Sequence, residues 1–528
     1  MKNYYITTPI YYPSAKLHLG HCYTTIAGDF ISRYKKMQGY NVFYLTGTDE
    51  HGEKLERKAQ DAEKKPKEFI DPIVDDIKNL WKSLDIDYTN FIRTTDVSHE
   101  TTVKKIFSQL LQSGDIYLGE YTGLYCVSCE TFFTETQSQD GCCPDCGAKL
   151  DEIKEESYFL RCSKYEKRLI NYIEENKNFI QPTSRKNELM SNFLKPGLKD
   201  LAISRTSFDW GIKVPDDDKH VIYVWLDALS NYISALGYKN ENINMMEQYW
   251  PADLHLLGKE IVRFHAVYWP ILLMALDLPL PKRMFAHGWI LMSGDKMSKS
   301  KGNVIYPEFL VENMGPDTVR YYLMSEMPFG DDGRFTADSF VNKINSDIAN
   351  SLGNLVNRTV SMSNQYLDGT VNKPIIAQQF IETSKLIESL DSLPLKLDGH
   401  IDNMELPKYI KEIQAIISQT NKYIDETKPW ILGKKENREE IGEVLYTILR
   451  SLEVINAYIS PVLPNISKAI AKNIGIGKVE LFSELVSRET FNVHENPSLI
   501  IERMDVEKTI KMINKEIEAN TKLAKENL

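Results

Sequence analysis

The chain has 528 residues, of which 42% are hydrophobic and 26% are charged, a composition typical of soluble globular proteins with about three domains at this length. The net charge of −11 argues against a protein that coats nucleic acid through bulk electrostatics, so a nucleic-acid partner would be bound locally. No signal peptide or membrane-spanning segment stands out, so we expect a cytoplasmic protein with no membrane partner.

The first elements in chain order predict a βαβ unit. Residues 2–12 are rich in Tyr, Ile and Thr and predict a strand, residues 18–37 predict a helix, and residues 40–46 predict a second strand. Such a unit has parallel strands and a right-handed crossover. Further strand-like runs lie at residues 220–226, 253–257 and 283–292. We therefore expect an α/β fold in which one Rossmann-like parallel sheet is split by an insertion.

The remaining segments predict the domain organisation. Long amphipathic runs at residues 341–366, 403–427 and 440–459 predict a helix bundle. The expected parts are the first half of the sheet at 1–114, a small insertion at 115–218, the second half at 219–335, the bundle at 336–505, and a charged, helix-forming appendage at 506–528.

The motif KLHLGH, residues 16–21, stands where the first predicted strand gives way to a helix. His18 and His21 are three residues apart, beside backbone N–H groups that favour an anion. Gly20 has no Cβ and lets a flat ligand approach the backbone. A structural role is an alternative, and a metal site lacks a nearby carboxylate ligand.

A second motif, GDKMSKSKGN, occupies residues 294–303. A solvated surface loop is one interpretation of its lysines. The other is a clasp in which Lys296, Lys299 and Lys301 stabilise charge that develops on a polyphosphate. The sequence contains no GxxxxGK[ST] and no GxGxxG motif, so a P-loop or nicotinamide site is not supported.

Two cysteine pairs lie in the predicted insertion. Cys126 and Cys129 form one C-x2-C pair, and Cys143 and Cys146 form another after 13 intervening residues. This pattern predicts one tetrahedral zinc site per chain with four cysteine ligands, structural because it has no open ligand position. Cys142 adjoins the second pair and is an alternative ligand, although the regular spacing favours Cys143. Unliganded buried thiols are the remaining alternative.

Together these motifs resemble class I aminoacyl-tRNA synthetases, which combine an HLGH-type motif with a KMSKS loop. More specifically, the order and spacing of several segments resemble methionyl-tRNA synthetases between about residues 5 and 432. The segments are TTPIYYPSAKLHLGH, GTDEHG, GLYCVSCETFF, ISRTSFDWGIKVP, YVWLDALSNYISAL, LLGKEIVRFHAVYWP, FAHGWILMSGDKMSKSKGN and ETKPWIL.

The resemblance implies a class I catalytic domain with a zinc-binding connective insertion and an anticodon-binding helix bundle. It implies an enzyme that activates L-methionine with ATP to methionyl-adenylate and then transfers it to the 3′ end of initiator and elongator tRNA(Met). The rival hypothesis is a non-catalytic RNA-binding factor with a degenerate synthetase body. The intact HLGH motif, Asp49 and the KMSKS motif argue against that rival.

The resemblance also assigns the ATP site. His18 and His21 are expected to hold the ATP phosphates, with Gly20 against the adenine. Lys296 and chiefly Lys299 are expected to stabilise the α-phosphate during the reaction, Ser300 contributes to the same site, and Mg²⁺ accompanies ATP. No protein nucleophile is required, because the methionine carboxylate itself attacks.

For the amino acid, the resemblance implies that Asp49 receives the α-ammonium group. A thioether is polarizable and packs favourably against aromatic rings, which suits a Trp, Tyr and His cluster, although aromatic residues at helical spacing are also common in cores. The other expected contacts are Ile10, Tyr12, Trp225, Ala228, Leu229, Tyr232, Ile261, His265 and Trp269.

In the predicted bundle, Asn354 and Arg358 are one helical turn apart and Trp430 follows a proline. The resemblance implies that these three residues read the CAU anticodon, with the Trp430 ring stacked on a base. Alternatively, Arg358 caps the bundle and Trp430 belongs to its core. Gly433 stands where the family more often has Ala, which we expect to loosen this helix end. Without a C-terminal OB-fold domain in this sequence, we expect a monomer.

Overall fold

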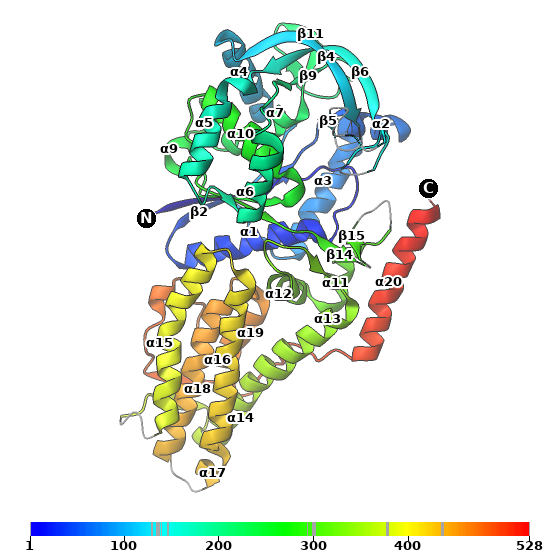
Figure 1. Cartoon of the computed structure of the whole chain (residues 1–528). Coiled ribbons are helices and arrows are strands. Elements are labelled where there is room, and N and C mark those ends of the chain that lie inside the picture. The colour runs from blue at the N-terminus through cyan, green and yellow to red at the C-terminus, as the bar shows by residue number, and fades with distance from the viewer. Residues whose placement is uncertain are drawn as a thin grey trace. The chain divides into compact units, whose positions relative to one another are not determined.

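The computed structural model describes residues 2–127, 130–133, 138, 140–144, 147–292, 294–297, 302–375, 380–434 and 438–526. The chain forms two compact units, shown with its elements in Figure 1. The first unit contains residues 1–17, 41–81 and 87–287. The second contains residues 18–40, 82–86 and 288–528. Among the described helices, none is long and apolar enough to cross a bilayer.

The first unit is built on a six-stranded parallel sheet with the order β3-β2-β1-β12-β13-β7. In register, Thr7 lies between Leu45 and His255. The strands are β1 (Asn3–Thr7), β2 (Asn41–Thr48), β3 (Asn90–Arg93), β7 (Ile180–Gln181), β12 (Leu254–Gly258) and β13 (Met284–His287). The predicted parallel sheet is therefore confirmed, but the predicted insertion at 115–218 is not separate from it, because β7 lies within those bounds and pairs with β13.

The insertion contributes two small antiparallel sheets to the first unit. One has the order β5-β4-β6-β8 and contains β4 (Ile116–Cys126), β5 (Thr131–Phe133), β6 (Asp151–Leu160) and β8 (Leu201–Ala202). The other has the order β10-β11-β9 and contains β9 (Ser204–Arg205), β10 (Lys213–Val214) and β11 (Asp217–Ile222). Strands β4 and β6 pair along most of their length, and Figure 1 shows them as a long curved ribbon.

Two sequence-based strand predictions need correction. Residues 220–226 were expected in the parallel sheet, but β11 ends at Ile222 in an antiparallel sheet and a helix begins at Val224. A short buried apolar run has no clear period, so strand and helix cannot be distinguished from it. Residues 283–292 divide into β13 and β14 (Ile290–Met292), which belong to different sheets.

The helices of the first unit bury their apolar faces in two clusters: α2 and α3 pack together through Leu55, Ile70 and Val74, and the others pack in or against one large core, in which α10 is buried along its whole length. They are α2 (Glu53–Asp61), α3 (Pro66–Ser83), α4 (Val97–Gln112), α5 (Cys162–Glu175), α6 (Thr183–Leu189), η2 (Met190–Leu194), α7 (Val224–Leu229), α8 (Asn231–Ser234), α9 (Met246–Tyr249), η3 (Lys259–Ile261), η4 (Phe264–Tyr268) and α10 (Trp269–Ala275).

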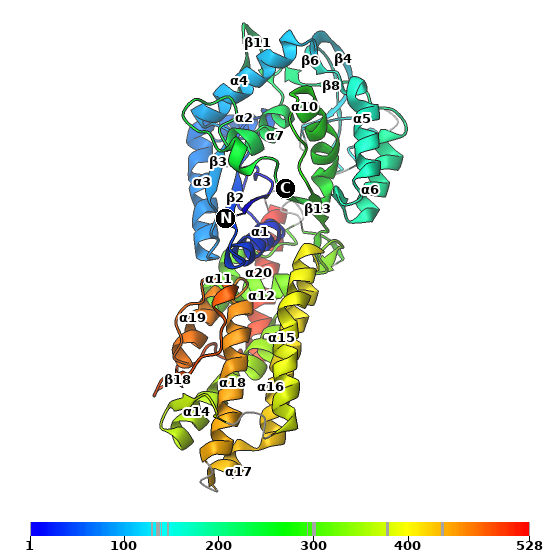
Figure 2. The ribbon, with the colours of Figure 1, turned by 90° about the vertical axis from the view of Figure 1, so that its left-hand side faces the viewer.

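The second unit contains a helix bundle in which α15, α16 and α18 run side by side (Figures 1 and 2). Its helices are α1 (Leu19–Met37), α11 (Pro307–Met314), α12 (Pro316–Glu326), α13 (Ala337–Lys343), η5 (Ile344–Gly353), α14 (Asn354–Leu367), α15 (Ile381–Asp402), α16 (Leu406–Thr427), α17 (Pro429–Lys434), α18 (Arg438–Ile459), α19 (Pro464–Asn473), η6 (Phe482–Glu484) and α20 (Val506–Glu526). The amphipathic runs used to predict the bundle are confirmed as helices.

Short strands complete the second unit. They are β14, β15 (Asp295–Lys296) and β16 (Gly333–Arg334) in one sheet, and β17 (Thr370–Asn372) and β18 (Thr490–Asn492) in another. The first of these sheets carries the start of the KMSKS motif, because Lys296 pairs in register with Leu291.

A buried ion pair fixes α1 within the second unit. Arg320 on α12 is fully buried, and its Nη2 lies 2.6 Å from the Oδ2 of Asp29 on α1. The same guanidinium group donates to the carbonyl groups of Pro461 and Val462, between α18 and α19. A buried arginine needs all of these acceptors, because an unpaired buried charge is costly. The helix that begins with the HLGH motif is therefore tied to the bundle.

Candidate active site

The GTDEHG segment makes a tight turn where β2 ends. The Asp49 N–H donates to the Tyr11 carbonyl at 3.0 Å, which holds this turn against the segment after β1. The neighbouring Glu50 carboxylate receives two bonds from Arg93, at 2.7 and 2.9 Å, and its carbonyl accepts the Trp210 indole N–H. The turn is therefore fixed on both sides of Asp49, at the carboxyl ends of parallel strands, where ligands of open α/β sheets bind.

The Asp49 carboxyl group lacks a counter-charge within the described residues. Its Oδ1 atom is buried and receives no hydrogen bond from any group that the structure describes. Burial raises the pKa of Asp49 well above its usual value, and the nearby carboxylates of Asp227, Glu130 and Glu50 raise it further. A buried acceptor in a negative field binds a small cation such as an ammonium group favourably.

Aromatic rings from five elements, namely α7, α8, η4, α10 and β12, lie close together in the first unit. Trp225 on α7 stacks on Phe264, with ring centroids 3.6 Å apart and planes 3° apart. Tyr232 on α8 lies 5.7 Å from the Trp269 ring and 4.4 Å from the His255 ring. This geometry presents ring faces and edges, which suit a polarizable thioether.

Hydrogen bonds orient the cluster. The Tyr232 hydroxyl lies 2.8 Å from His265 Nε2, and His265 Nδ1 lies 3.0 Å from the Ile261 carbonyl oxygen. The carbonyl can only accept, so Nδ1 carries the proton and Nε2 accepts from Tyr232. Burial lowers the pKa of His265 to about 4, so the ring is neutral at pH 7. The tyrosine hydroxyl is thus held in one orientation.

Most sequence-predicted methionine contacts lie in or against the same core. Leu229 belongs to it, and Ala228 is also buried. Ile10 and Ile261 pack against this core from its edge. Tyr12 is half-buried and donates a hydrogen bond to Glu130 at 3.0 Å. The structure therefore places these residues in the first unit, with Tyr12 packed against the smaller cluster of α2 and α3.

A buried polar chain connects the Asp49 turn to α7. The Asp227 carboxylate lies 2.7 Å from His51 Nδ1 through one oxygen and 2.7 Å from His99 Nε2 through the other. Burial opposes the charge, yet the two imidazoles hold the pKa of Asp227 below its usual range. The chain continues from His99 to the Ser234 hydroxyl at 2.7 Å. It fixes the helix that carries Trp225 against the turn that carries Asp49.

The HLGH motif forms the start of α1 in the second unit. His18 is the N-cap residue, and its Nδ1 accepts from the Gly20 N–H at 3.1 Å, while His21 Nδ1 accepts from the His18 N–H at 3.1 Å. The two rings lie 4.0 Å apart. A Cβ at position 20 would lie 2.9 Å from His18 Cε1, so any larger residue here would push the His18 ring from its place. Two imidazole rings beside the N–H groups of a helix start are an arrangement that favours an anion.

Part of the KMSKS motif can be placed. Lys296 lies in β15, whereas Lys299 and Ser300 lie outside the described residues. Gly302, after the motif, has φ of 67°, and its carbonyl accepts from the Thr521 hydroxyl at 3.0 Å. Asn520 donates to the Val304 carbonyl at 3.3 Å. The predicted charged tail is thus helix α20, and it packs on the segment that follows the motif.

Half of the predicted zinc site lies within the described residues. Cys126 and Cys143 are both buried and pack in one small cluster with Leu150, whereas Cys142 is partly exposed. Cys129 and Cys146 lie outside the described residues. No group of three metal-ligating side chains occurs among the described residues. The cluster nevertheless fits the donor set, since it pairs one thiol from each C-x2-C motif.

The predicted anticodon residues lie at one end of the bundle. The Arg358 guanidinium lies 5.8 Å from the centre of the Trp430 ring and 3.2 Å from Asp425. Asn354 is exposed one turn earlier on α14. A Cβ at Gly433 would lie 2.4 Å from the Tyr366 ring. Gly433 therefore allows close packing of α17 on α14, and the expected loosening of this helix end stays a prediction.

Sequence reasoning missed several residues that orient the predicted ones. Phe264 stacks on Trp225, and Asp227 connects two histidines across the site. Asp227 and Phe264 lie within the quoted motifs, but neither pattern distinguishes an orienting side chain from a core residue. Glu130 follows a predicted zinc ligand and contacts Tyr12, and no local signal indicates this long-range contact.

Comparison with known proteins defines the class of the chain. A family model described as tRNA synthetases class I (M) matches residues 4–152 and 147–360, and a model of the anticodon binding domain of methionyl tRNA ligase matches residues 376–493. With the split parallel sheet and the HLGH motif, these matches make the chain a class I aminoacyl-tRNA synthetase.

Individual relatives identify the family within this class. The methionine–tRNA ligase of Clostridium acetobutylicum is 52% identical, with 97% of this chain and 80% of the relative covered. That of Caldanaerobacter subterraneus subsp. tengcongensis is 51% identical, with 99% and 82% covered. The chain belongs to the methionyl-tRNA synthetase family and is a methionine–tRNA ligase (EC 6.1.1.10), as the sequence predicted.

Solved structures agree with this assignment. The Mycobacterium tuberculosis methionyl-tRNA synthetase in complex with methionyl-adenylate is 38% identical and matches with a TM-score of 0.92, covering 95% of this chain and all of that chain. The free form of the same synthetase matches with a TM-score of 0.85 at 36% identity, covering 96% of this chain and 99% of that chain.

Proposed function

We propose that the cluster around Asp49 binds the methionine substrate. Asp49 supplies the counter-charge for the α-ammonium group, and Tyr232, His265 and Trp225 surround the thioether. The observation that carries this proposal is the buried Oδ1 of Asp49, which receives no hydrogen bond from the described residues and lies in a field of other carboxylates. A substrate ammonium group supplies the missing cation.

The orientation of Tyr232 supports selection of methionine over leucine. Its hydroxyl donates to His265 Nε2, so the hydroxyl oxygen and the ring edge are held in place beside the thioether site. Shape alone discriminates by only about 1–3 kcal/mol per methylene in an apolar site. The fixed aromatic ring edge adds to this, because a polarizable thioether packs favourably against it and leucine has no sulfur atom.

ATP is bound by the motifs of the second unit in this proposal. His18 and His21 hold phosphate oxygens at the start of α1, and Gly20 leaves room for the adenine. Lys296, Lys299 and Ser300 stabilise the α-phosphate, and Mg²⁺ accompanies the ATP phosphates. The adjacent histidine rings and the N–H groups at a helix start support this assignment.

The reaction needs position and charge rather than a protein nucleophile. The methionine carboxylate attacks the α-phosphorus, the bond to the β,γ-phosphates breaks, and pyrophosphate leaves with the electron pair. A 3′-terminal ribose hydroxyl of tRNA(Met) then attacks the activated carbonyl carbon, and AMP leaves. Lysine side chains that meet the developing negative charge lower the barrier of the first step.

The same proposal assigns a structural zinc ion and a tRNA-binding face. Cys126, Cys129, Cys143 and Cys146 would hold zinc, which would stabilise the fold of the insertion when bound. The burial of Cys126 with Cys143 supports this choice over Cys142. A Cys143→Ser protein that keeps a full equivalent of zinc would show the ligand choice to be wrong.

At the end of the bundle, Asn354, Arg358 and Trp430 would read the CAU anticodon of initiator and elongator tRNA(Met). The match to a methionyl anticodon binding domain over residues 376–493 supports this face. The half-exposed Trp430 ring, with a guanidinium group beside it, suits stacking on a splayed base. We also propose that the protein acts in the cytoplasm as a monomer.

Methionine-dependent ATP–pyrophosphate exchange tests the catalytic part of the proposal. Lys299→Ala should reduce this exchange by about 10²–10³-fold, the scale of one lost transition-state donor. Lys282→Ala is the control, because Lys282 is exposed and paired with Asp253, and it should exchange normally. Near-normal exchange by Lys299→Ala would refute the role of this lysine, and no exchange by the parent protein would support the non-catalytic rival.

A further inference from the structure

Glu130 links the zinc-bearing insertion to the proposed methionine site within the first unit. It follows the first C-x2-C pair in the sequence, yet its side chain reaches back to the start of the chain. Its Oε1 accepts a hydrogen bond from the Tyr12 hydroxyl at 3.0 Å and another from the Lys54 backbone N–H at 3.2 Å. The residue is 6% exposed, so these contacts are shielded from water.

The site of the Glu130 carboxylate is built by its neighbours. Helix α2 begins after Gly52, and no side chain of its own N-cap residue satisfies the first N–H groups. The Glu130 carboxylate takes this place, where the helix dipole favours an anion. A Cβ at Gly52 would lie 2.3 Å from Glu130 Oε1, so the absence of a side chain at position 52 leaves the space that the carboxylate occupies.

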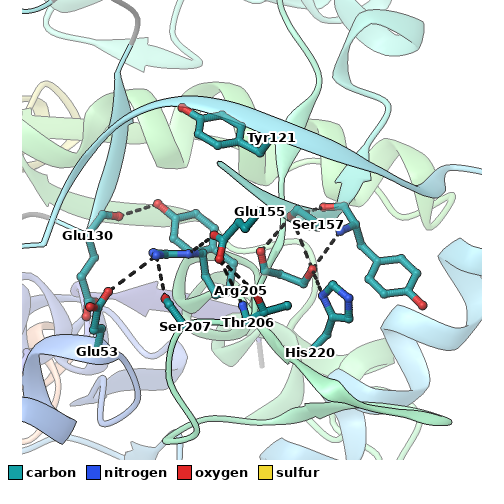
Figure 3. A network of polar contacts seen from close by, with 12 residues as sticks. Glu53, Tyr121, Glu130, Glu155, Ser157, Arg205, Thr206, Ser207 and His220 are labelled. Atoms are coloured by element: carbon teal, nitrogen blue, oxygen red, sulfur yellow. Dashed lines mark hydrogen bonds and ion pairs between the residues drawn. The ribbon is translucent and has the colours of Figure 1, made fainter. Parts of the chain in front are cut away.

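The backbone of Glu130 is also fixed. Its φ of 47° lies in the left-handed region, and its carbonyl accepts the Tyr223 hydroxyl, one residue before α7. Figure 3 shows Glu130 beside Glu53, at one end of the polar network around Arg205. Arg205 is buried, lies 3.6 Å from Glu53, and stacks on the Tyr125 ring at 4.0 Å. The insertion and the start of α2 therefore hold one another in place.

The geometry points to Glu130 as a positioning residue for the methionine site: by accepting the Tyr12 hydroxyl it fixes the Tyr12 ring where the amino acid binds. This inference rests on the proposed function, because the contact of Tyr12 with methionine is part of that proposal. Tyr12 lies one residue after Tyr11, whose carbonyl holds the Asp49 turn. Without this hydrogen bond the Tyr12 side chain would populate several rotamers, and methionine binding would then carry the entropic cost of selecting one of them.

Three substitutions separate position from charge. Glu130→Ala removes the acceptor and should raise both the Kd and the KM for methionine about tenfold, while kcat and the KM for ATP stay within about twofold. Glu130→Asp keeps the charge but is one methylene too short to reach Tyr12, so it should resemble Glu130→Ala. Glu130→Gln has the right length and an oxygen acceptor, so it should remain within about threefold of the parent protein.

A double-mutant cycle tests the partner. Tyr12→Phe should raise the methionine KM by a similar factor, and Tyr12→Phe combined with Glu130→Ala should add almost nothing, whereas independent effects would multiply to about a hundredfold. Tyr117→Phe is the matched control, since its hydroxyl also donates to a carboxylate, that of Asp200 at 2.9 Å, away from the proposed site. It should leave the methionine KM unchanged.

The measurements are titration calorimetry with methionine and steady-state pyrophosphate exchange, with the melting temperature and the zinc content of each variant. The inference would be overturned by an unchanged methionine Kd in Glu130→Ala, or by multiplicative effects on the methionine KM in the double-mutant cycle. It would also be overturned if Glu130→Asp bound methionine normally while Glu130→Gln did not. If the parent protein neither binds methionine nor exchanges pyrophosphate, the proposed function itself fails, which is a distinct result.

Discussion

The proposed methionine site and the proposed anticodon face use aromatic side chains in opposite ways. In the first unit, Tyr232 is 1% exposed and His265 is 3% exposed, and a hydrogen bond joins them. In the second unit, the Arg358 side chain is 40% exposed and its partner Asp425 is 67% exposed. One aromatic group is locked inside a core, and the other stands near an exposed surface ion pair.

This difference follows from the size of the ligand. Methionine is small, so its discrimination depends on contacts that are already oriented before it binds. A tRNA anticodon brings its own bases, which stack on exposed rings and gain contacts over a large area. Substitutions in the buried site should therefore change amino-acid activation steeply, whereas substitutions on the anticodon face should change only tRNA charging, and more mildly.

The largest expected effect is that of Asp49→Asn. The substitution keeps the shape of the side chain but removes the charge that we expect to pair with the α-ammonium group. Loss of one partner of a buried charge pair costs about 2–5 kcal/mol, so the kcat/KM for methionine in pyrophosphate exchange should fall by about 10²–10³-fold. Asp209→Asn is the control, because Asp209 is exposed. An Asp49→Asn enzyme with normal methionine kcat/KM would contradict the assignment.

Trp430→Ala should impair the proposed anticodon face and leave the proposed methionine site intact. Loss of one base–aromatic stack costs about 1–3 kcal/mol, so the KM for tRNA(Met) should rise about 10–100-fold while pyrophosphate exchange is unchanged. Ile431→Ala removes a neighbouring exposed side chain of α17 without removing an aromatic ring, and it should charge tRNA normally. If Trp430→Ala loses both activities, Trp430 is structural and the two regions are not separable.

Much of the fold was predictable because its signals are periodic and local. The helix after HLGH and the amphipathic runs of the bundle were placed within a few residues, whereas the strand before HLGH was predicted to end at Tyr12 and ends at Thr7. The prediction was wrong at residues 224–226, because a fully buried apolar run carries neither a period of 2 nor one of 3.6. A short helix and a short strand look alike when every side chain is buried.

Only those residues of the candidate site that match family motifs were predictable from the sequence. The family resemblance supplied Asp49, Tyr232 and His265, and the structure brings their segments together in one unit. The resemblance could not supply the contact between Glu130 and Tyr12, because the two residues are 118 positions apart and their contact depends on how the insertion folds against the start of the chain. The hydrogen bonds that orient a site depend on tertiary packing and leave no pattern in a single sequence.

A smaller effect, on pH dependence, would sharpen the contrast. Burial raises the pKa of Asp49, and Asp227, Glu130 and Glu50 raise it further. Protonation of Asp49 removes the partner of the ammonium group, so the methionine KM should rise as the pH falls through this raised pKa, by about tenfold per unit on the acid side. In Asp49→Asn the methionine KM should no longer rise as the pH falls, and in the parent enzyme the KM for tRNA(Met) should not rise over the same pH range. A parent enzyme whose methionine KM stays flat as the pH is lowered to the point where the protein unfolds would show that Asp49 does not bind the ammonium group.

The smallest effect tests how the anticodon face is supported. An alanine Cβ at position 433 would lie 2.4 Å from the Tyr366 ring, so α17 must shift from α14 or the ring must turn away. We expect Gly433→Ala to lower the free energy of unfolding by about 1–2 kcal/mol and to raise the KM for tRNA(Met) only a few-fold, because Trp430 itself remains. Gly442→Ala on α18 is the matched control: its Cβ meets no atom within 4 Å, so the helix should gain about 1 kcal/mol instead. If Gly433→Ala lowers the free energy of unfolding and Gly442→Ala raises it, close packing at Gly433 positions α17. If both substitutions raise it, the end of α17 can move without losing the contact of Trp430 with the anticodon.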